Sequence, residues 1–149
     1  MKPLTSVPVT TRAAALSNVL NAAARVVTGT QKYDRGLRRI LRDELHWLSV
    51  PQRVKFKLGT MMHRCLHNSA PRYLCDYCIP VANVGARSQL RSASRHQVVV
   101  PRYNTSTFGR RAFSVVGPTV WNSLPDKLRD PSLLIDSFRR QLKTFLFSD

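Results

Sequence analysis

Residues 51–68 read PQRVKFKLGTMMHRCLHN and predict an amphipathic helix. Proline is favoured at a first helical position because its missing N–H would have no partner there. Apolar side chains recur at three- and four-residue steps along this stretch, which predicts one buried stripe. The stripe comprises Val54, Leu58, Met61 and Cys65, and the basic side chains around it are Arg53, Lys55, Lys57 and Arg64.

Two more helices are predicted before this one. Residues 13–27 carry an apolar face, with Thr11 as a cap at the start and Gly29 at the end. That face comprises Leu16, Val19, Leu20, Ala23, Val26 and Val27. Residues 34–45 follow, with Asp34 as the N-cap. Their inward residues are Leu37, Ile40, Leu41 and Leu45, and Arg35, Arg38, Arg39 and Arg42 occupy the other side.

Shorter elements are predicted after residue 68. Residues 72–78 form a helix that Pro80 stops, and residues 118–124 form another that carries Trp121. The final helix has Asp130 as its cap, begins at Pro131 and runs to Phe147. Its predicted buried face comprises Leu134, Phe138, Leu142 and Phe145.

Two runs rich in β-branched residues predict short strands, QVVV at 97–100 and FSVV at 113–116. We expect them to form a hairpin-like pair, although the loop between them is longer than a tight turn. The predicted fold class is therefore mainly α, a small helical bundle with a short β-hairpin-like insertion near 97–116. The expected organisation is a flexible lead at 1–12, a helical region at 13–79, and a basic tail region at 80–149 with short strands and a C-terminal helix.

The charge of the chain indicates a polyanionic partner. Its 149 residues hold 24 Lys and Arg against eight Asp and Glu, a formal charge of +16. Arginine supplies 18 of the 24 cations, and its planar fork binds phosphate in two places, whereas lysine is a point charge. Three cysteines are too few for a secreted disulfide framework. No apolar run approaches the roughly 18 residues of a membrane-spanning helix, so we expect no membrane partner.

One acid-free stretch is the best candidate for a nucleic-acid surface. Residues 77–125 hold six Arg and no Asp or Glu, which keeps the local field positive and suits phosphate contacts. Tyr103, Phe108 and Trp121 offer possible stacking faces. The alternative is that the arginines form a solvated surface and the aromatics pack in the core. The full candidate set is Arg38, Arg39, Arg42, Arg53, Lys55, Lys57, Arg87, Arg91, Arg95, Arg102, Arg110 and Arg111.

Catalytic and metal sites find little support in the sequence. The acidic residues include no Asp-Asp pair and no D-x-D, so we predict no catalytic residue and no catalytic metal. The spacing of Cys75 and Cys78 matches half of a zinc site. A weak zinc alternative combines these two cysteines with His63 and His67, which lie one helical turn apart. A further alternative is an enzyme with a cysteine nucleophile at position 65, 75 or 78.

Several strings together resemble one protein family. ELHWLSVPQRVKFK at 44–57 resembles the segment after the polymerase palm of non-LTR (LINE-type, Jockey-like) retrotransposon reverse transcriptases. LRSASRHQVVVPR at 90–102, RAFSVVGPTVWNSLP at 111–125 and FRRQLKTFLFSD at 138–149 are similar to the C-terminal tail of the same proteins. The resemblance runs from about Leu16 to Asp149, and residues 1–15 do not share it.

The resemblance implies RNA-directed DNA synthesis by the whole enzyme. The family's [FY]-A-D-D box, whose aspartates hold magnesium in the palm, does not occur in this sequence, so no catalytic residue carries over and magnesium belongs to the missing palm. The helices up to residue 68 resemble a thumb or post-thumb region that packs near the template–primer duplex. The resemblance therefore implies a catalytically inactive C-terminal fragment that binds the RNA or DNA backbone with little sequence preference.

A different function class fits the same residues. If the apolar helices evolved to pack on a palm, their faces would seek a partner, and the chain would be a protein-interaction module. The rest of a reverse transcriptase would then be one possible partner. Family and charge favour the nucleus as the compartment.

Overall fold

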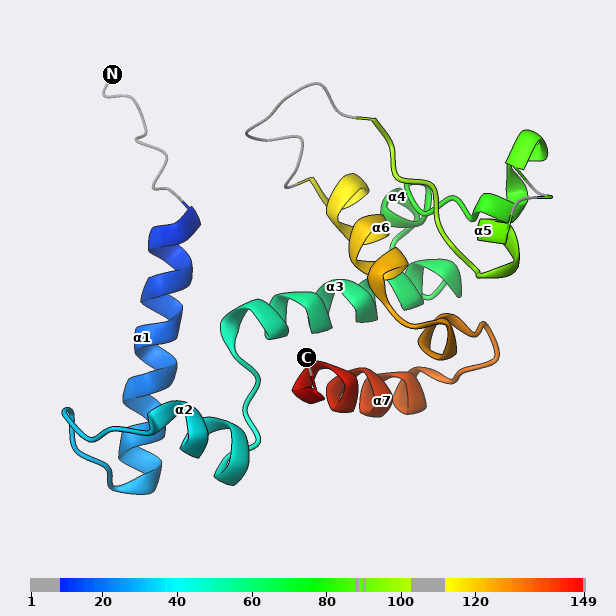
Figure 1. Ribbon diagram of the computed structural model, residues 1–149. Coiled ribbons are helices and arrows are strands. Elements are labelled where there is room, and N and C mark those ends of the chain that lie inside the picture. The colour runs from blue at the N-terminus through cyan, green and yellow to red at the C-terminus, as the bar shows by residue number, and fades with distance from the viewer. Residues whose placement is uncertain (1–8, 88, 90, 103–111, 149) are drawn as a thin grey trace, which may run out of the picture. The chain divides into compact units, whose positions relative to one another are not determined.

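The computed structural model describes residues 9–87, 89, 91–102 and 112–148 (Figure 1). The fold is mainly helical, as predicted, and contacts divide it into two compact units, Met1–Arg53 and Val54–Asp149. This division falls inside a helix, whereas the sequence placed its change of character at residue 80. The elements are α1 (Val9–Thr28), α2 (Leu37–Arg39), η1 (Ile40–Glu44), α3 (Val50–Leu66), α4 (Arg72–Cys75), η2 (Val81–Asn83), η3 (Gly85–Arg87), α5 (Arg91–Ser94), α6 (Phe113–Ser123), η5 (Asp126–Arg129) and α7 (Ile135–Ser148).

The first unit contains α1, α2 and the π-helical turn η1. Helix α1 begins at Val9, so Thr11 lies inside the helix and is not its cap, and the predicted lead at 1–12 is helical from Val9 onward. Residues 1–8 lie outside the described part of the chain. The helix ends at Gly29 as predicted, and this glycine has a φ of +68°, a left-handed conformation that favours glycine.

The predicted helix at 34–45 is shorter than the sequence indicated. Asp34 accepts a hydrogen bond from the backbone N–H of Gln31 at 2.7 Å, so it closes a turn and does not cap a helix. Helix α2 begins after Gly36, whose φ is +91°. The backbone then widens into η1, where the N–H of Leu45 donates to the carbonyl oxygen of Ile40 at 3.0 Å. None of the residues of α2 or η1 is buried.

Most of the predicted apolar face of α1 is exposed to solvent. Val26 is 84% exposed, Val19 65% and Leu16 58%, whereas Ala24, outside that face, is fully buried. The amphipathic pattern therefore identified the helix correctly but does not describe what this unit buries.

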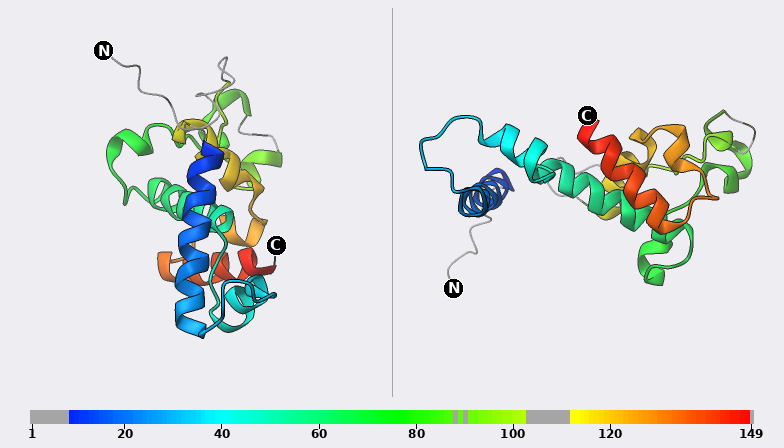
Figure 2. Two further views of the ribbon diagram at one scale, coloured as in Figure 1. Left: turned by 90° about the vertical axis from the view of Figure 1, so that its left-hand side faces the viewer. Right: turned by 90° about the horizontal axis from the view of Figure 1, so that it is seen from below.

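The second unit is built on α3, which packs against α6 and α7. A Cβ added at Gly59 of α3 would lie 3.1 Å from Leu142 of α7, and one added at Gly117 of α6 would lie 2.8 Å from the sulfur of Met62. The helices approach closely at these two points because glycine has no side chain there. Figures 1 and 2 show α7 beside α3. The largest fully buried side chains are Phe138, Met62, Leu142, Leu146, Val98 and Pro118.

The buried face of α3 differs from the predicted stripe. Cys65 is buried as expected, but Val54 is 53% exposed. Met62 and His63 face the core instead. The predicted stripe chose Met61 over its neighbour Met62 and left out Gly59 and His63, whereas α3 buries Met62, this glycine and this histidine between two neighbouring helices.

The predicted strand at 113–116 is wrong, because these residues form the first turn of α6. Val115, Pro118 and Trp121 recur every three residues and are all buried, so packing of a helical stripe overrides the strand preference of the β-branched residues. The other run forms no hairpin with this segment. Val98 instead makes an isolated antiparallel bridge with Pro80, and the N–H of Val99 donates to the carbonyl oxygen of Ile79 at 2.9 Å.

The last helix begins four residues later than predicted. Asp130 accepts a hydrogen bond from the N–H of Ser132 at 2.8 Å, which closes a turn, and this bond holds the pKa of the Asp130 carboxyl below its usual range. Helix α7 then starts at Ile135. Leu134 consequently lies before the helix and is 77% exposed, while Phe138 and Leu142 are fully buried as predicted. Leu146 is buried in place of Phe145, which is only half-buried.

Candidate nucleic-acid interface

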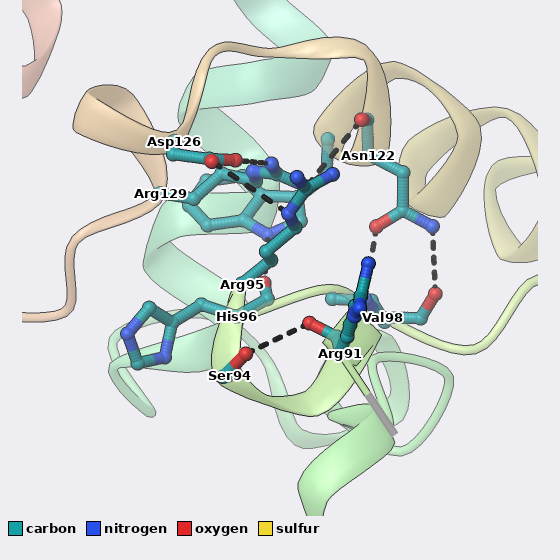
Figure 3. A network of polar contacts seen from close by, with 9 residues as sticks. Arg91, Ser94, Arg95, His96, Val98, Asn122, Asp126 and Arg129 are labelled. Carbon is teal, nitrogen blue, oxygen red and sulfur yellow. Dashed lines mark hydrogen bonds and ion pairs between the residues drawn. The ribbon is translucent and has the colours of Figure 1, made fainter. Parts of the chain in front are cut away.

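Within the acid-free stretch, the segment at residues 96–98 is anchored to α6 by the side-chain amide of Asn122 (Figure 3). Its Oδ1 accepts a hydrogen bond from the backbone N–H of Val98 at 2.9 Å, and its Nδ2 donates to the carbonyl oxygen of Val98 at 2.8 Å. One amide thus pairs with both backbone groups of one residue, as a neighbouring strand would. Val98 also forms a bridge with Pro80, so it is held both by α6 and by the segment around residue 80.

The neighbouring indole makes a second anchor. The Nε1–H of Trp121 donates to the carbonyl oxygen of His96 at 3.0 Å. His96 itself has a φ of +53°, a left-handed conformation that is unusual for a residue with a side chain. The Trp121 and Asn122 side chains together set the path of residues 96–98, which follow directly after Arg95.

Two arginines share the carboxylate of Asp126 (Figure 3). Arg129 is 4% exposed and forms an ion pair with Oδ1 through its Nη2 atom. Arg95 is 60% exposed, and its Nε atom lies 3.9 Å from Oδ2. The Nε–H of Arg129 is buried without a hydrogen-bond acceptor. An unpaired buried donor of this kind costs about 1–3 kcal/mol.

The candidate cations of the second unit lie mostly at the surface. Arg91, Arg95 and Arg102 are exposed, and so are Lys55 and Lys57 on α3. The backbone of Arg87 lies in η3, but its side chain is outside the described part of the structure, as are Arg110 and Arg111. The structure brings Arg95 together with Arg129, which the sequence reasoning did not single out.

The candidate cations of the first unit form a separate exposed group. Arg38, Arg39 and Arg42 lie on α2 and η1, and the Nε of Arg39 lies 3.4 Å from Asp43 Oδ2. Arg53 donates from its Nε to the carbonyl oxygen of Leu48 at 2.8 Å. The Arg53 guanidinium also lies over the Trp47 ring, 5.8 Å from its centroid. Each unit therefore carries basic residues of its own.

His63 belongs to the core. Its ring stacks on Phe138 with a centroid distance of 4.5 Å, and its Nε2 lies 2.9 Å from the carbonyl oxygen of Leu133. Since a carbonyl oxygen only accepts, Nε2 carries the proton. Burial lowers the pKa of His63, so the ring is neutral near pH 7. Its Nδ1 is buried without a partner.

The structure does not bring together the four residues of the weak zinc alternative, His63, His67, Cys75 and Cys78. The His67 ring lies tilted beside the His63 ring with a centroid distance of 4.2 Å, while the thiol of Cys75 donates to the carbonyl oxygen of Ala70 and that of Cys78 to the sulfur of Met62. Within the described residues, no three His, Cys, Asp or Glu side chains form a group able to hold a metal ion. The four donors of the zinc alternative are therefore not gathered into one group in the described part of the chain.

The buried thiols also lack the features of a nucleophile. Burial raises the pKa of Cys65 to about 12, and nearby Cys78 adds to this effect. Burial raises the pKa of Cys78 as well. Both thiols are therefore protonated near pH 7, whereas a thiolate is the reactive form.

Comparison with protein-family models, with curated proteins and with solved structures gives no match to this chain. No helix in the described ranges is long and apolar enough to cross a membrane.

Proposed function

We propose that the chain is the C-terminal part of a non-LTR retrotransposon reverse transcriptase, lacks polymerase activity on its own, and binds the RNA or DNA backbone with little sequence preference. The observation that carries this proposal is the exposed pair Arg91 and Arg95, which lies in an acid-free segment of a chain with a charge of +16. Trp121 and Asn122 hold the residues that follow this pair, so the two charges are presented from a fixed part of the fold.

Salt dependence is the direct test of backbone binding. If four cations contact phosphates of a single strand, the association constant should fall about 50-fold between 50 and 200 mM salt, because bound cations release counterions. The measurement is fluorescence anisotropy with labelled RNA and DNA single strands of unrelated sequences. Affinity that is absent at low salt, or that does not change with salt, would contradict the proposal.

Charge-matched variants locate the surface. The double variant Arg91→Ala/Arg95→Ala should reduce the slope of log K against log salt by about 1–2 for every sequence tested. The control Arg139→Ala/Arg140→Ala removes the same charge from the exposed side of α7 and should leave the slope nearly unchanged. Equal effects of the two variants would mean that only the net charge matters.

The exposed face of α1 favours a second candidate function, a module that packs on the rest of a reverse transcriptase. Val19 and Val26 lie on that face and are largely exposed. The variant Val19→Glu/Val26→Glu should weaken association with a separately made palm domain more than about tenfold, since it places charges in an apolar contact. The control is Ala14→Glu/Asn18→Glu, two exposed positions on the other side of α1. Similar affinities for both variants in calorimetry would exclude this function for the face.

A further inference from the structure

The second unit contains a cavity of about 300 Å³ next to the anchored segment. Five separate stretches of chain line it, around residues 66–67, 80–82, 96–98, 121 and 129–131. Its walls are mainly apolar and include Leu66, Val98 and Trp121. This volume is at the lower end of the about 300–1,000 Å³ typical of ligand pockets, so it suits one ring system better than a helix or a lipid chain.

The residues of the cavity wall that carry polar side chains are His67, His96, Gln97, Arg129 and Asp130. Arg129 contributes to the wall, and its Nε–H has no acceptor. The other guanidinium bonds fix Arg129 on Asp126 and on the carbonyl oxygen of Asn122, 3.5 Å from Nη1. His67 and His96 also line the cavity and are exposed to solvent. A ligand for this site would be flat, largely apolar on its faces and equipped with acceptors on its edge.

We propose that this cavity binds one unstacked nucleobase of a single-stranded nucleic acid. Bases have apolar faces and carry carbonyl oxygens and ring nitrogens that accept hydrogen bonds, and proteins recognise single strands by drawing such bases out of the stack. The exposed Arg95, next to His96, would meet a phosphate of the same strand. Asp130 also lines the cavity, and its negative charge disfavours a phosphate there, which favours the base as the occupant.

This inference rests on the proposed nucleic-acid binding, and the test separates the two. The probes are a labelled oligouridylate and a strand of equal length that carries the same sugar–phosphate backbone without bases. The intact strand should bind about 5- to 150-fold more tightly, the range that one base contact provides. Both strands should show the salt dependence of backbone binding.

Matched alanine positions locate the bound base. Ala82 lines the cavity, and Ala82→Phe should fill it and remove most of the advantage of the intact strand. Ala86 is also exposed but does not line the cavity, so Ala86→Phe should retain the advantage. In a Trp47→Phe background, which leaves Trp121 as the single tryptophan, the intact strand should change the emission and the abasic strand should not.

Each outcome decides the inference. Equal, salt-dependent affinity of the intact and abasic strands overturns the nucleobase site while backbone binding stands. An advantage that survives Ala82→Phe, with Trp121 emission unchanged on binding, overturns the cavity as its location. Absence of binding to either strand at low salt overturns both proposals.

Discussion

Replacing Leu142 by alanine is expected to lower the free energy of unfolding by about 2–5 kcal/mol. Leu142 is fully buried on α7, and one of its methyl groups lies where α3 leaves room because residue 59 is a glycine. The substitution removes apolar contacts and leaves a hole that rigid helices on both sides cannot fill. Urea titration followed by circular dichroism measures the change.

Leu134 provides a matched control for this prediction. The same substitution, Leu134→Ala, should change the free energy of unfolding by less than about 0.5 kcal/mol, because this side chain is 77% exposed ahead of α7. The sequence pattern placed both leucines on one buried face. Similar losses for the two variants would mean that Leu134 is buried as deeply as Leu142 and would contradict this prediction.

Replacing Asn122 by alanine is expected to cost about 2–4 kcal/mol, because it leaves both the N–H and the carbonyl group of Val98 without their partner. The alanine methyl group makes neither of the two hydrogen bonds, and Val98 is 2% exposed, so water replaces them poorly. Urea titration gives the loss of stability, and hydrogen exchange of the Val98 amide reports the broken bond directly.

Ser123 is the control for Asn122. It is the next residue on α6, it is exposed, and its hydroxyl bonds only to the nearby carbonyl oxygen of Val120. Ser123→Ala should change stability by less than about 0.5 kcal/mol and leave the Val98 amide protected. A Val98 amide that exchanges at the same rate in wild type and in Asn122→Ala would show that the amide does not hold this segment.

Helices were easier to predict than the faces they bury. The three-to-four-residue periodicity identified α1, α3 and α7 as helices, although α1 and α7 begin four residues away from their predicted starts, because a continuous amphipathic pattern over several turns is typical of a helix. The same pattern misplaced Val54 and Leu134, because what a helix buries depends on the number and direction of its neighbours. Gly59 is an example. Because it has no side chain, Leu142 of α7 can approach α3 closely, and the pattern of apolar residues does not predict this contact.

The strand assignments failed for a related reason. Val115 and Val116 are β-branched and were assigned to a strand, but the close packing of Gly117 on Met62 and the burial of Trp121 require a helix. The run around Val98 is extended, but its partner is Pro80 and not the later run. Pairing between distant segments depends on tertiary contacts that local propensity does not describe.

The candidate interface was predicted only in its exposed part. The net charge and the absence of acidic residues around them singled out Arg91 and Arg95 as candidates, because an exposed cation contributes to the field of the protein without a specific tertiary partner. Asn122 and Arg129 were missed, since an amide or a guanidinium acquires its role from partners far along the chain. The one feature of the sequence that could have drawn attention to them is the stretch WNSLPDKLRD at 121–130, in which polar side chains able to form hydrogen bonds alternate with residues typical of turns.

The position of α7 has a consequence during translation. On α3, Met62 packs against Gly117 of α6 and Gly59 packs against Leu142 of α7, and α7 contributes its last core residue at Leu146. At a synthesis rate of about 5–20 residues per second, Leu146 follows Leu66 by roughly 4–16 s. Throughout that interval the nascent chain lacks all or part of α7, so the side of α3 at Gly59 stays without the helix that covers it until synthesis reaches the end of this unit.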